Sequence, residues 1–148
     1  MKALIALVLL AACGSAPPAT TTPPPTTTTA LADVAFDKLD HDQKIEFMKQ
    51  KVVPAMKPLF QNHDATKFAE FGCKTCHGKD PEAAKFKMPN GDLPKLDFGD
   101  MSKFKPADIE WMKNDIMPTM AKTLGLPPHS ADNPTGFGCL GCHTQAGA

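Results

Sequence analysis

The sequence contains no arginine and no tyrosine, has a single tryptophan, and carries no net charge. All 16 basic residues are lysines, and 16 acidic residues balance them. Nucleic-acid-binding domains usually show a clustered basic excess, so this balance gives no support for that class. Alternating runs of β-branched residues, which are typical of strands, are also missing. We therefore expect one all-α domain that does not bind nucleic acid.

Long apolar runs are missing as well, apart from ALIALVLLAA at 3–12, which follows Lys2. This run is too short to span a bilayer comfortably, and we interpret residues 1–12 as a signal peptide. Small residues before Cys13 resemble the lipobox of bacterial lipoproteins, in which the signal is cut before an acylated cysteine. The resemblance implies lipidation of Cys13 and an extracytoplasmic, periplasmic location on a bacterial membrane. Gly14 indicates the outer membrane. The alternative is an ordinary signal peptide with a chance cysteine.

The next segment, SAPPATTTPPPTTTTA at 15–30, has no large apolar residue and cannot contribute to a core. Its prolines favour an extended conformation, in which about fifteen residues reach roughly 45 Å. We interpret residues 13–30 as the lipidated cysteine with a tether that holds a globular head off the membrane. Simple disorder is the alternative. The folded domain should occupy residues 31–148.

The folded part contains an internal repeat. IEFMKQKVVPAM at 45–56 matches IEWMKNDIMPTM at 109–120, and FGCKTCHG at 71–78 matches FGCLGCHT at 137–144. Self-similarity of this kind indicates that one structural unit occurs twice. Each unit consists of an upstream segment, a variable connector and a Cys-x-x-Cys-His motif.

Both upstream segments have the periodicity of amphipathic helices. The apolar positions are Ile45, Met48, Val52, Met56 and Leu59 in the first copy, and Ile109, Met112, Ile116, Met120 and Leu124 in the second. Asp40 or Asp42 can cap the first helix. Pro54 and Pro118 should kink the helices or end their regular parts. The Pro- and Gly-rich segment 88–100 should be a loop, so we expect low regular structure and long connectors.

Cys-x-x-Cys-His is the attachment motif of c-type haem. On a helical turn, two cysteines three residues apart point the same way, so their thiols can form thioethers with the two vinyl groups of one haem. The histidine that follows then reaches the iron. The sequence therefore predicts two covalently bound haems c, one on Cys73, Cys76 and His77 and one on Cys139, Cys142 and His143. Two large rings would also supply core that the side chains do not.

Other chemistry is open to the same cysteines. Paired Cys-x-x-Cys motifs suit a tetrahedral zinc site, although zinc requires neither histidine. Two disulfides are compatible with export. A redox dithiol is a third alternative, but the βαβ context of thioredoxin-like proteins is missing. Haem is favoured because the motif occurs twice behind an export signal.

The sixth iron ligand is predicted to be Met56 for the first haem and Met120 for the second. Both methionines lie two residues after a proline, and methionine on iron raises the haem potential. Methionines on an apolar stripe also commonly just pack. The rival ligands are the pairs Met48 and Met112 or His63 and His129, and for the first haem Met88.

The order of helix, methionine on that helix, connector and Cys-x-x-Cys-His resembles the repeated unit of the photosynthetic reaction-centre cytochrome subunit. The similarity covers about residues 40–78 and 105–144, and it implies that methionines on the helices are the distal ligands, carried here onto Met56 and Met120. This chain has two such units rather than four. A dihaem cytochrome c domain of a bacterial envelope is the expectation that fits both features.

The function expected from the sequence is electron transfer between redox proteins, without an enzymatic reaction or a small-molecule substrate. With no arginine in the chain, lysines should pair with the haem propionates. A small haem enzyme or gas sensor, such as a dihaem peroxidase with one open iron position, is the alternative. A structural or metal-binding lipoprotein without haem is a third possibility.

Overall fold

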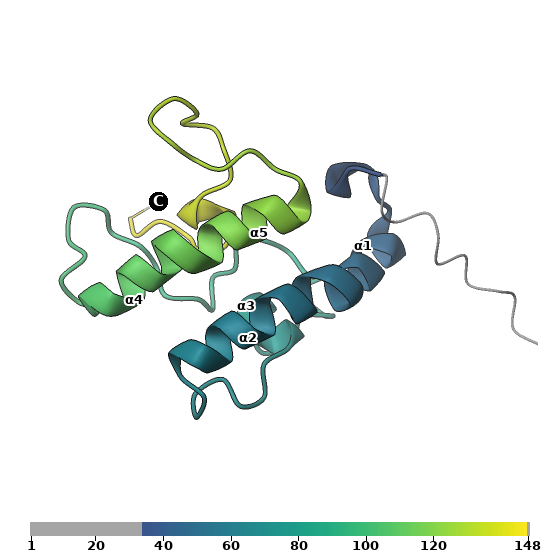
Figure 1. The fold of residues 1–148 in the computed structure, drawn as a ribbon, viewed down its shortest axis with the longest axis horizontal. Coiled ribbons are helices and arrows are strands. Elements are labelled where there is room, and N and C mark those ends of the chain that lie inside the picture. Colours follow the sequence, from purple (N-terminus) through teal and green to yellow (C-terminus); the bar gives the residue numbers. More distant parts are fainter. Residues whose placement is uncertain (1–33, 148) are drawn as a thin grey trace, which may run out of the picture.

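The computed structural model describes residues 34–147. The signal peptide, Cys13, the tether and the expected start of the domain near Leu31 lie outside the described residues. Within them the structure is helical and contains no strand, only three isolated bridges, which agrees with the all-α prediction. Two long helices dominate the fold, and most of the remaining chain is irregular (Figure 1).

The first long helix begins after a short 3₁₀ turn, η1 (Phe36–Lys38), and contains α1 (His41–Phe47), η2 (Met48–Val52) and α2 (Val53–His63). Asp40 caps its start, because its carboxylate accepts a hydrogen bond from the Gln43 backbone N–H at 2.9 Å and the Gln43 side chain bonds back to Asp40 at 3.0 Å. This reciprocal pair confirms the expected cap.

The second long helix repeats the same design with α4 (Pro106–Trp111), η3 (Met112–Ile116) and α5 (Met117–Leu124). Pro106 occupies its first turn, where the missing N–H costs nothing. The helix ends at Gly125, whose φ of 68° is left-handed.

Both helices contain a π-helical turn just before the proline that the two repeats share, Pro54 in the first and Pro118 in the second. In η2 the Val53 N–H bonds to the Met48 carbonyl, and in η3 the Met117 N–H bonds to the Met112 carbonyl, one residue further back than in an α-helix. Pro54 and Pro118 are then the second residues of the α-helices that resume. The regular α-helical hydrogen bonding is interrupted before each proline, as expected. The helix nevertheless continues, because the wider π turn does not require a hydrogen bond from the proline nitrogen, which has no N–H.

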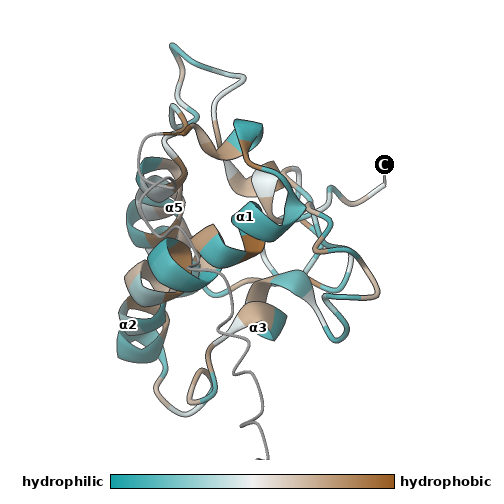
Figure 2. Ribbon diagram, turned by 90° about the vertical axis from the view of Figure 1, so that its right-hand side faces the viewer, coloured by the Kyte–Doolittle hydropathy of each residue, from teal (hydrophilic) through white to brown (hydrophobic). Residues whose placement is uncertain are grey.

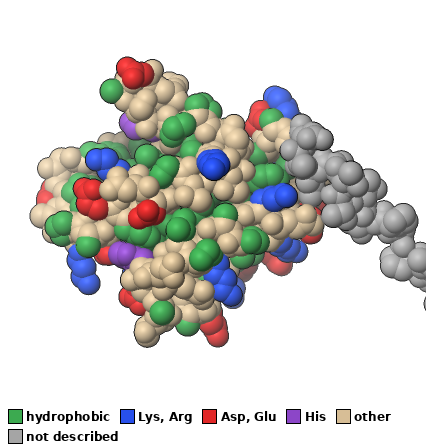
Figure 3. Space-filling model, viewed as in Figure 1, with side chains coloured by type: hydrophobic (Ala, Val, Ile, Leu, Met, Phe, Trp, Pro, Cys, Tyr) green, Lys and Arg blue, Asp and Glu red, His purple; other side chains and the backbone are tan. Residues whose placement is uncertain are grey.

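The two long helices pack against one another in antiparallel directions. Both η2 and α2 contact α5, and α2 also contacts η3, while α1 and α5 lie at one end of the pair and α2 and α4 at the other (Figure 1). Residues from both helices form the main apolar cluster: Leu39, Phe47, Val52, Met56, Phe60, Ile116, Met120 and Leu124. Figure 3 shows hydrophobic side chains gathered over this pair, with charged side chains scattered around them.

The two Cys-x-x-Cys-His segments lie on the same side of the helix pair. Figure 2 shows α2 and α5 on one side of the molecule, and α3 (Cys73–His77) with the C-terminal end on the other. The second motif contains the 3₁₀ turn η4 (Cys139–Gly141). Among residues 34–147, no helix combines the length and the hydropathy needed to cross a bilayer.

Candidate cofactor-binding site

An apolar cavity of about 360 Å³ lies between the first long helix and the Cys-x-x-Cys-His segments. Side chains from both halves of the repeat line it. Its apolar walls include Ile45, Met48, Val52, Met56, Phe71, Met88, Met120, Leu124 and Phe137. One cavity therefore joins the two repeat units, rather than each unit enclosing a separate space.

The predicted binding residues of the first unit come together at this cavity. Cys73, Cys76 and His77, on the single turn α3, line it together with Met56 from α2. Met56 has the most buried side chain of the described part of the chain, with 0% of its surface exposed. Gly72 adds open space, since a Cβ atom built there would meet nothing within 4 Å.

The predicted binding residues of the second unit are only partly at this cavity. Cys142 and Met120 line it, whereas Cys139 and His143 are not among its lining residues. The 3₁₀ turn that carries Cys139 is shorter than α3, so the two copies of the motif differ in local structure although their sequences match.

The two motif histidines are held differently. The Nδ1 atom of His143 lies 2.9 Å from the Pro94 carbonyl, and a proton on Nδ1 would leave the Nε2 lone pair free to bind a metal. The Nδ1 atom of His77 is buried without a well-aligned hydrogen bond. Burial lowers the pKa of His77, which favours the neutral ring that metals bind, and a weaker interaction with the Phe86 backbone opposes this.

All four cysteines of the motifs are free thiols. Burial raises the pKa of Cys76 to about 12 and that of Cys142 to about 11, and the neighbouring Cys142 adds to the shift of Cys76. A protonated thiol is a poor nucleophile, so their surroundings make Cys76 and Cys142 less reactive than an ordinary cysteine. Residues 34–147 contain no group of three or more His, Cys, Asp or Glu arranged to hold a metal ion.

The ionisable nitrogen side chains that line the cavity are positively charged or become so when protonated. Lys44 and Lys85 are its two lysines, His41 and His77 are its histidines, and no lining residue is acidic. Neither lysine forms an ion pair within the part of the chain that the structure describes. A ligand with an apolar body and anionic groups would match this lining.

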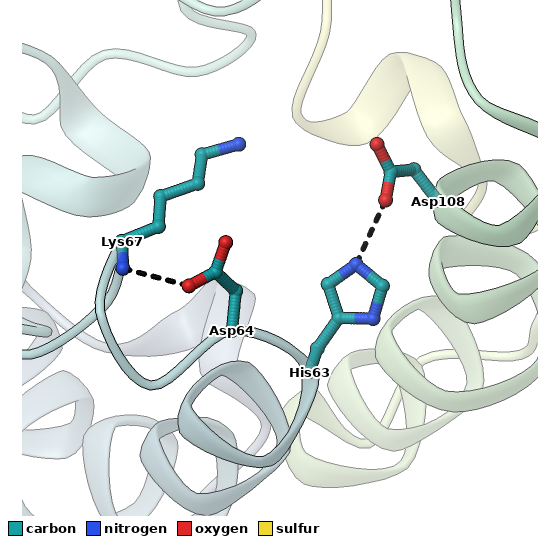
Figure 4. A network of polar contacts seen from close by, with 4 residues as sticks. All are labelled: His63, Asp64, Lys67 and Asp108. Atoms are coloured by element: carbon teal, nitrogen blue, oxygen red, sulfur yellow. Dashed lines mark hydrogen bonds and ion pairs between the residues drawn. The ribbon is translucent and has the colours of Figure 1, made fainter.

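The rival distal ligands fall into two groups. Met48 and Met88 line the cavity, whereas Met112 packs against the apolar cluster instead. His63 lies at the end of α2, stacked on Trp111 with ring centroids 3.9 Å apart, and its Nε2 atom is 2.8 Å from Asp108 (Figure 4). His129 is exposed, with Nδ1 2.9 Å from the Pro134 carbonyl. Neither histidine lines the cavity.

Sequence reasoning missed several residues of the site. Lys85 and Phe86 have the left-handed φ values of 51° and 52°, and the Phe86 ring meets the His77 ring edge-on at 5.4 Å. Asn90 binds both motifs through hydrogen bonds. The irregular segment that contains these residues has no periodicity, so only the spatial structure could reveal them. His41, at the start of α1, is exposed and also lines the cavity.

The chain was compared with protein-family models, with curated proteins and with solved structures, and none of the three comparisons gave a match.

Proposed function

We propose that the protein is a membrane-anchored dihaem c-type cytochrome that carries electrons between redox proteins in a bacterial cell envelope. The observation that carries this proposal is the apolar cavity at which Cys73, Cys76, His77 and Met56 come together. These residues are two thiols for covalent attachment and a nitrogen and a sulfur donor for iron, which is the donor set of a His/Met haem c.

The size of the cavity supports the presence of a large bound group. The cavity of about 360 Å³ is lined mainly by apolar side chains. A covalently attached apolar ring would fill this space and bury those side chains.

Each part of the site has a role in this proposal. The four cysteines would hold the two haems, and His77 and His143 would each supply a nitrogen ligand for iron. The Pro94 carbonyl, 2.9 Å from Nδ1, orients His143. Met56 and Met120 would supply the sulfur ligands, and Lys44 and Lys85, which line the cavity, would pair with the propionates. When bound, each haem supplies an iron that accepts and releases one electron. The protein attaches, orients and shields it.

The anchor belongs to the same proposal. Acylation of Cys13 and the tether 13–30 would hold the haem domain near the membrane surface, where membrane-bound redox partners are within reach. The Cys13→Ser variant should appear in the soluble fraction of cells that retain the wild-type protein in the membrane fraction. Retention of the variant in the membrane would contradict the lipid anchor.

Intact-mass measurement of protein matured in a host with c-type cytochrome assembly tests the cofactor. We expect two covalent haem additions and a c-type pyridine haemochrome spectrum. The Cys73→Ala/Cys76→Ala and Cys139→Ala/Cys142→Ala variants should each lose one addition. A colourless product with the mass of the bare chain, or zinc without iron in metal analysis, would refute the proposal. Rapid carbon monoxide binding to one reduced haem would instead indicate an enzyme or a sensor.

A further inference from the structure

The connector that follows the first motif touches both motifs through a single residue, Asn90. Its backbone N–H donates to the Cys142 carbonyl at 2.9 Å, and its side-chain Nδ2 donates to the Cys76 carbonyl at 3.0 Å. Asn90 therefore binds the second cysteine of each Cys-x-x-Cys-His sequence. The Cys76 carbonyl belongs to the last turn of α3, where carbonyls lack partners within the helix, so Asn90 also satisfies an otherwise unpaired group.

The Asn90 side chain is itself held in one orientation. Its Oδ1 accepts a hydrogen bond from the Asp92 N–H at 2.9 Å, which leaves Nδ2 to donate to Cys76. Asp92 also accepts from the Lys79 N–H at 3.3 Å. Gly78 lies directly against this group, with a left-handed φ of 81°, and a Cβ there would lie 2.8 Å from Nδ2 of Asn90. The turn after the first motif therefore packs closely against the Asn90 side chain and leaves no room for a side chain at position 78.

The connector is bound more extensively to the second motif than to the first. Beyond Asn90, the Pro94 carbonyl lies 2.9 Å from Nδ1 of His143. The Leu96 N–H donates to Thr144 at 2.9 Å, and the Ala146 N–H donates to Leu96 at 2.8 Å. The Asn90 side chain therefore links Cys76 of the first motif to a connector that is held against the second motif.

We infer that Asn90 is a positioning residue that sets the orientation of the two haems relative to one another. This inference rests on the proposed function, because it requires a haem on each motif. The cysteines fix each haem to its own motif, and Asn90 fixes the two motifs to one another. Without the side-chain bond, the first motif can shift relative to the second, which changes the distance and angle between the groups attached to them.

Circular dichroism of the Soret band in the full-length holoprotein tests this inference. Two chromophores held close together in a fixed arrangement give a two-signed band whose size depends on their distance and relative angle. Asn90→Asp keeps the shape of the side chain but turns its donor into a charged acceptor facing the Cys76 carbonyl. Asn90→Ala removes the side-chain bonds without adding charge. Both variants should have a much weaker two-signed band with unchanged absorption bands of the individual haems.

The matched control is Asn62→Asp, which adds the same charge at an exposed position of α2. This variant should keep the wild-type dichroism. A two-signed band that is unchanged in both Asn90 variants would overturn the inference even if their melting temperatures fall, because Asn90 would then only stabilise the loop. A wild-type protein with two haems by mass but no two-signed band would overturn it as well. Absence of the two haem masses would refute the proposed function itself.

Discussion

The sharpest prediction concerns Met56, for which an iron ligand and a packing residue must be separated. Its side chain is fully buried, lines the cavity and belongs to the apolar cluster of the helix pair. Replacement by alanine would remove a buried side chain and cost about 2–5 kcal/mol. Because domains are stable by only about 5–15 kcal/mol, an alanine variant could lose its ligand simply by loosening the fold.

Met56→Leu avoids this ambiguity. Leucine fills nearly the same volume, so the free energy of unfolding should fall by less than about 1.5 kcal/mol from packing alone. Leucine has no donor atom for iron, however. If Met56 is the distal ligand, the near-infrared band of methionine bound to ferric iron should disappear from one haem, and the potential of that haem should fall.

The assay is near-infrared absorption of the oxidised holoprotein together with a redox titration. Met117→Leu is the matched control, because Met117 begins α5 and does not line the cavity. If Met56→Leu keeps the band and both potentials, Met56 only packs against the haem. The same measurements on Met88→Leu and Met48→Leu would then identify which other lining methionine binds the iron.

Three further predictions address the cavity charges, the helix cap and the π turn. The double variant Lys44→Gln/Lys85→Gln should lower a haem potential by an amount equivalent to about 0.2–1 kcal/mol, the range of an exposed ion pair. Lys57→Gln, outside the cavity, should leave the potential unchanged. If the redox titrations of the double variant and the wild-type protein are the same, the two lysines do not pair with propionates. Asp40→Ala should lower the free energy of unfolding, measured by chemical denaturation, by about 1 kcal/mol, because α1 loses its capping box. An unchanged free energy of unfolding would show that the cap does not stabilise the protein. Pro54→Ala should restore a backbone N–H and so favour a regular α-helix over the π turn η2. The near-infrared methionine–iron band should weaken, while the far-ultraviolet circular dichroism stays unchanged. A band of wild-type strength would contradict this role of the π turn.

The helices could be predicted from the sequence because their information is local. Five-residue apolar stripes at helical spacing identified both of them. Five stripe positions are buried: Val52 and Met56 in the first helix, and Ile116, Met120 and Leu124 in the second. The Asp40 cap and the loop at 88–100 follow from equally local signals.

The aromatic contacts around Phe60 could not be predicted in the same way. Its ring lies 4.7 Å from that of Phe71 and 4.8 Å from that of Trp111, which belongs to the second helix. The Phe60–Trp111 contact arises because the two helices are antiparallel, and a repeat in the sequence does not specify the direction of packing. For the same reason the stacking of His63 on Trp111, away from the cavity, has no signal in the sequence.

The sequence singled out several residues that line the cavity, but it did not reveal how the connector joins the two motifs. The motif residues follow from their spacing and Met56 from the repeat, whereas the hydrogen bonds of Asn90 join irregular segments that are far apart in the chain. No periodic pattern records such contacts. The sequence also does not reveal that Cys139 and His143 lie outside the cavity lining, whereas Cys73 and His77 belong to it. The two motif sequences are alike, and only their surroundings differ.

The π turn of the first helix explains why Pro54 precedes the candidate ligand Met56. Met48 and Met56 are eight residues apart, which in an uninterrupted α-helix would place them about 80° apart around the axis. A π turn accommodates one extra residue and reduces this angle to about 20°. Both methionines line the cavity, as this correction requires. Pro54 stabilises the wide turn by lacking the N–H that a regular turn would use, so the proline aims the side chains of α2 at the cavity rather than ending the helix.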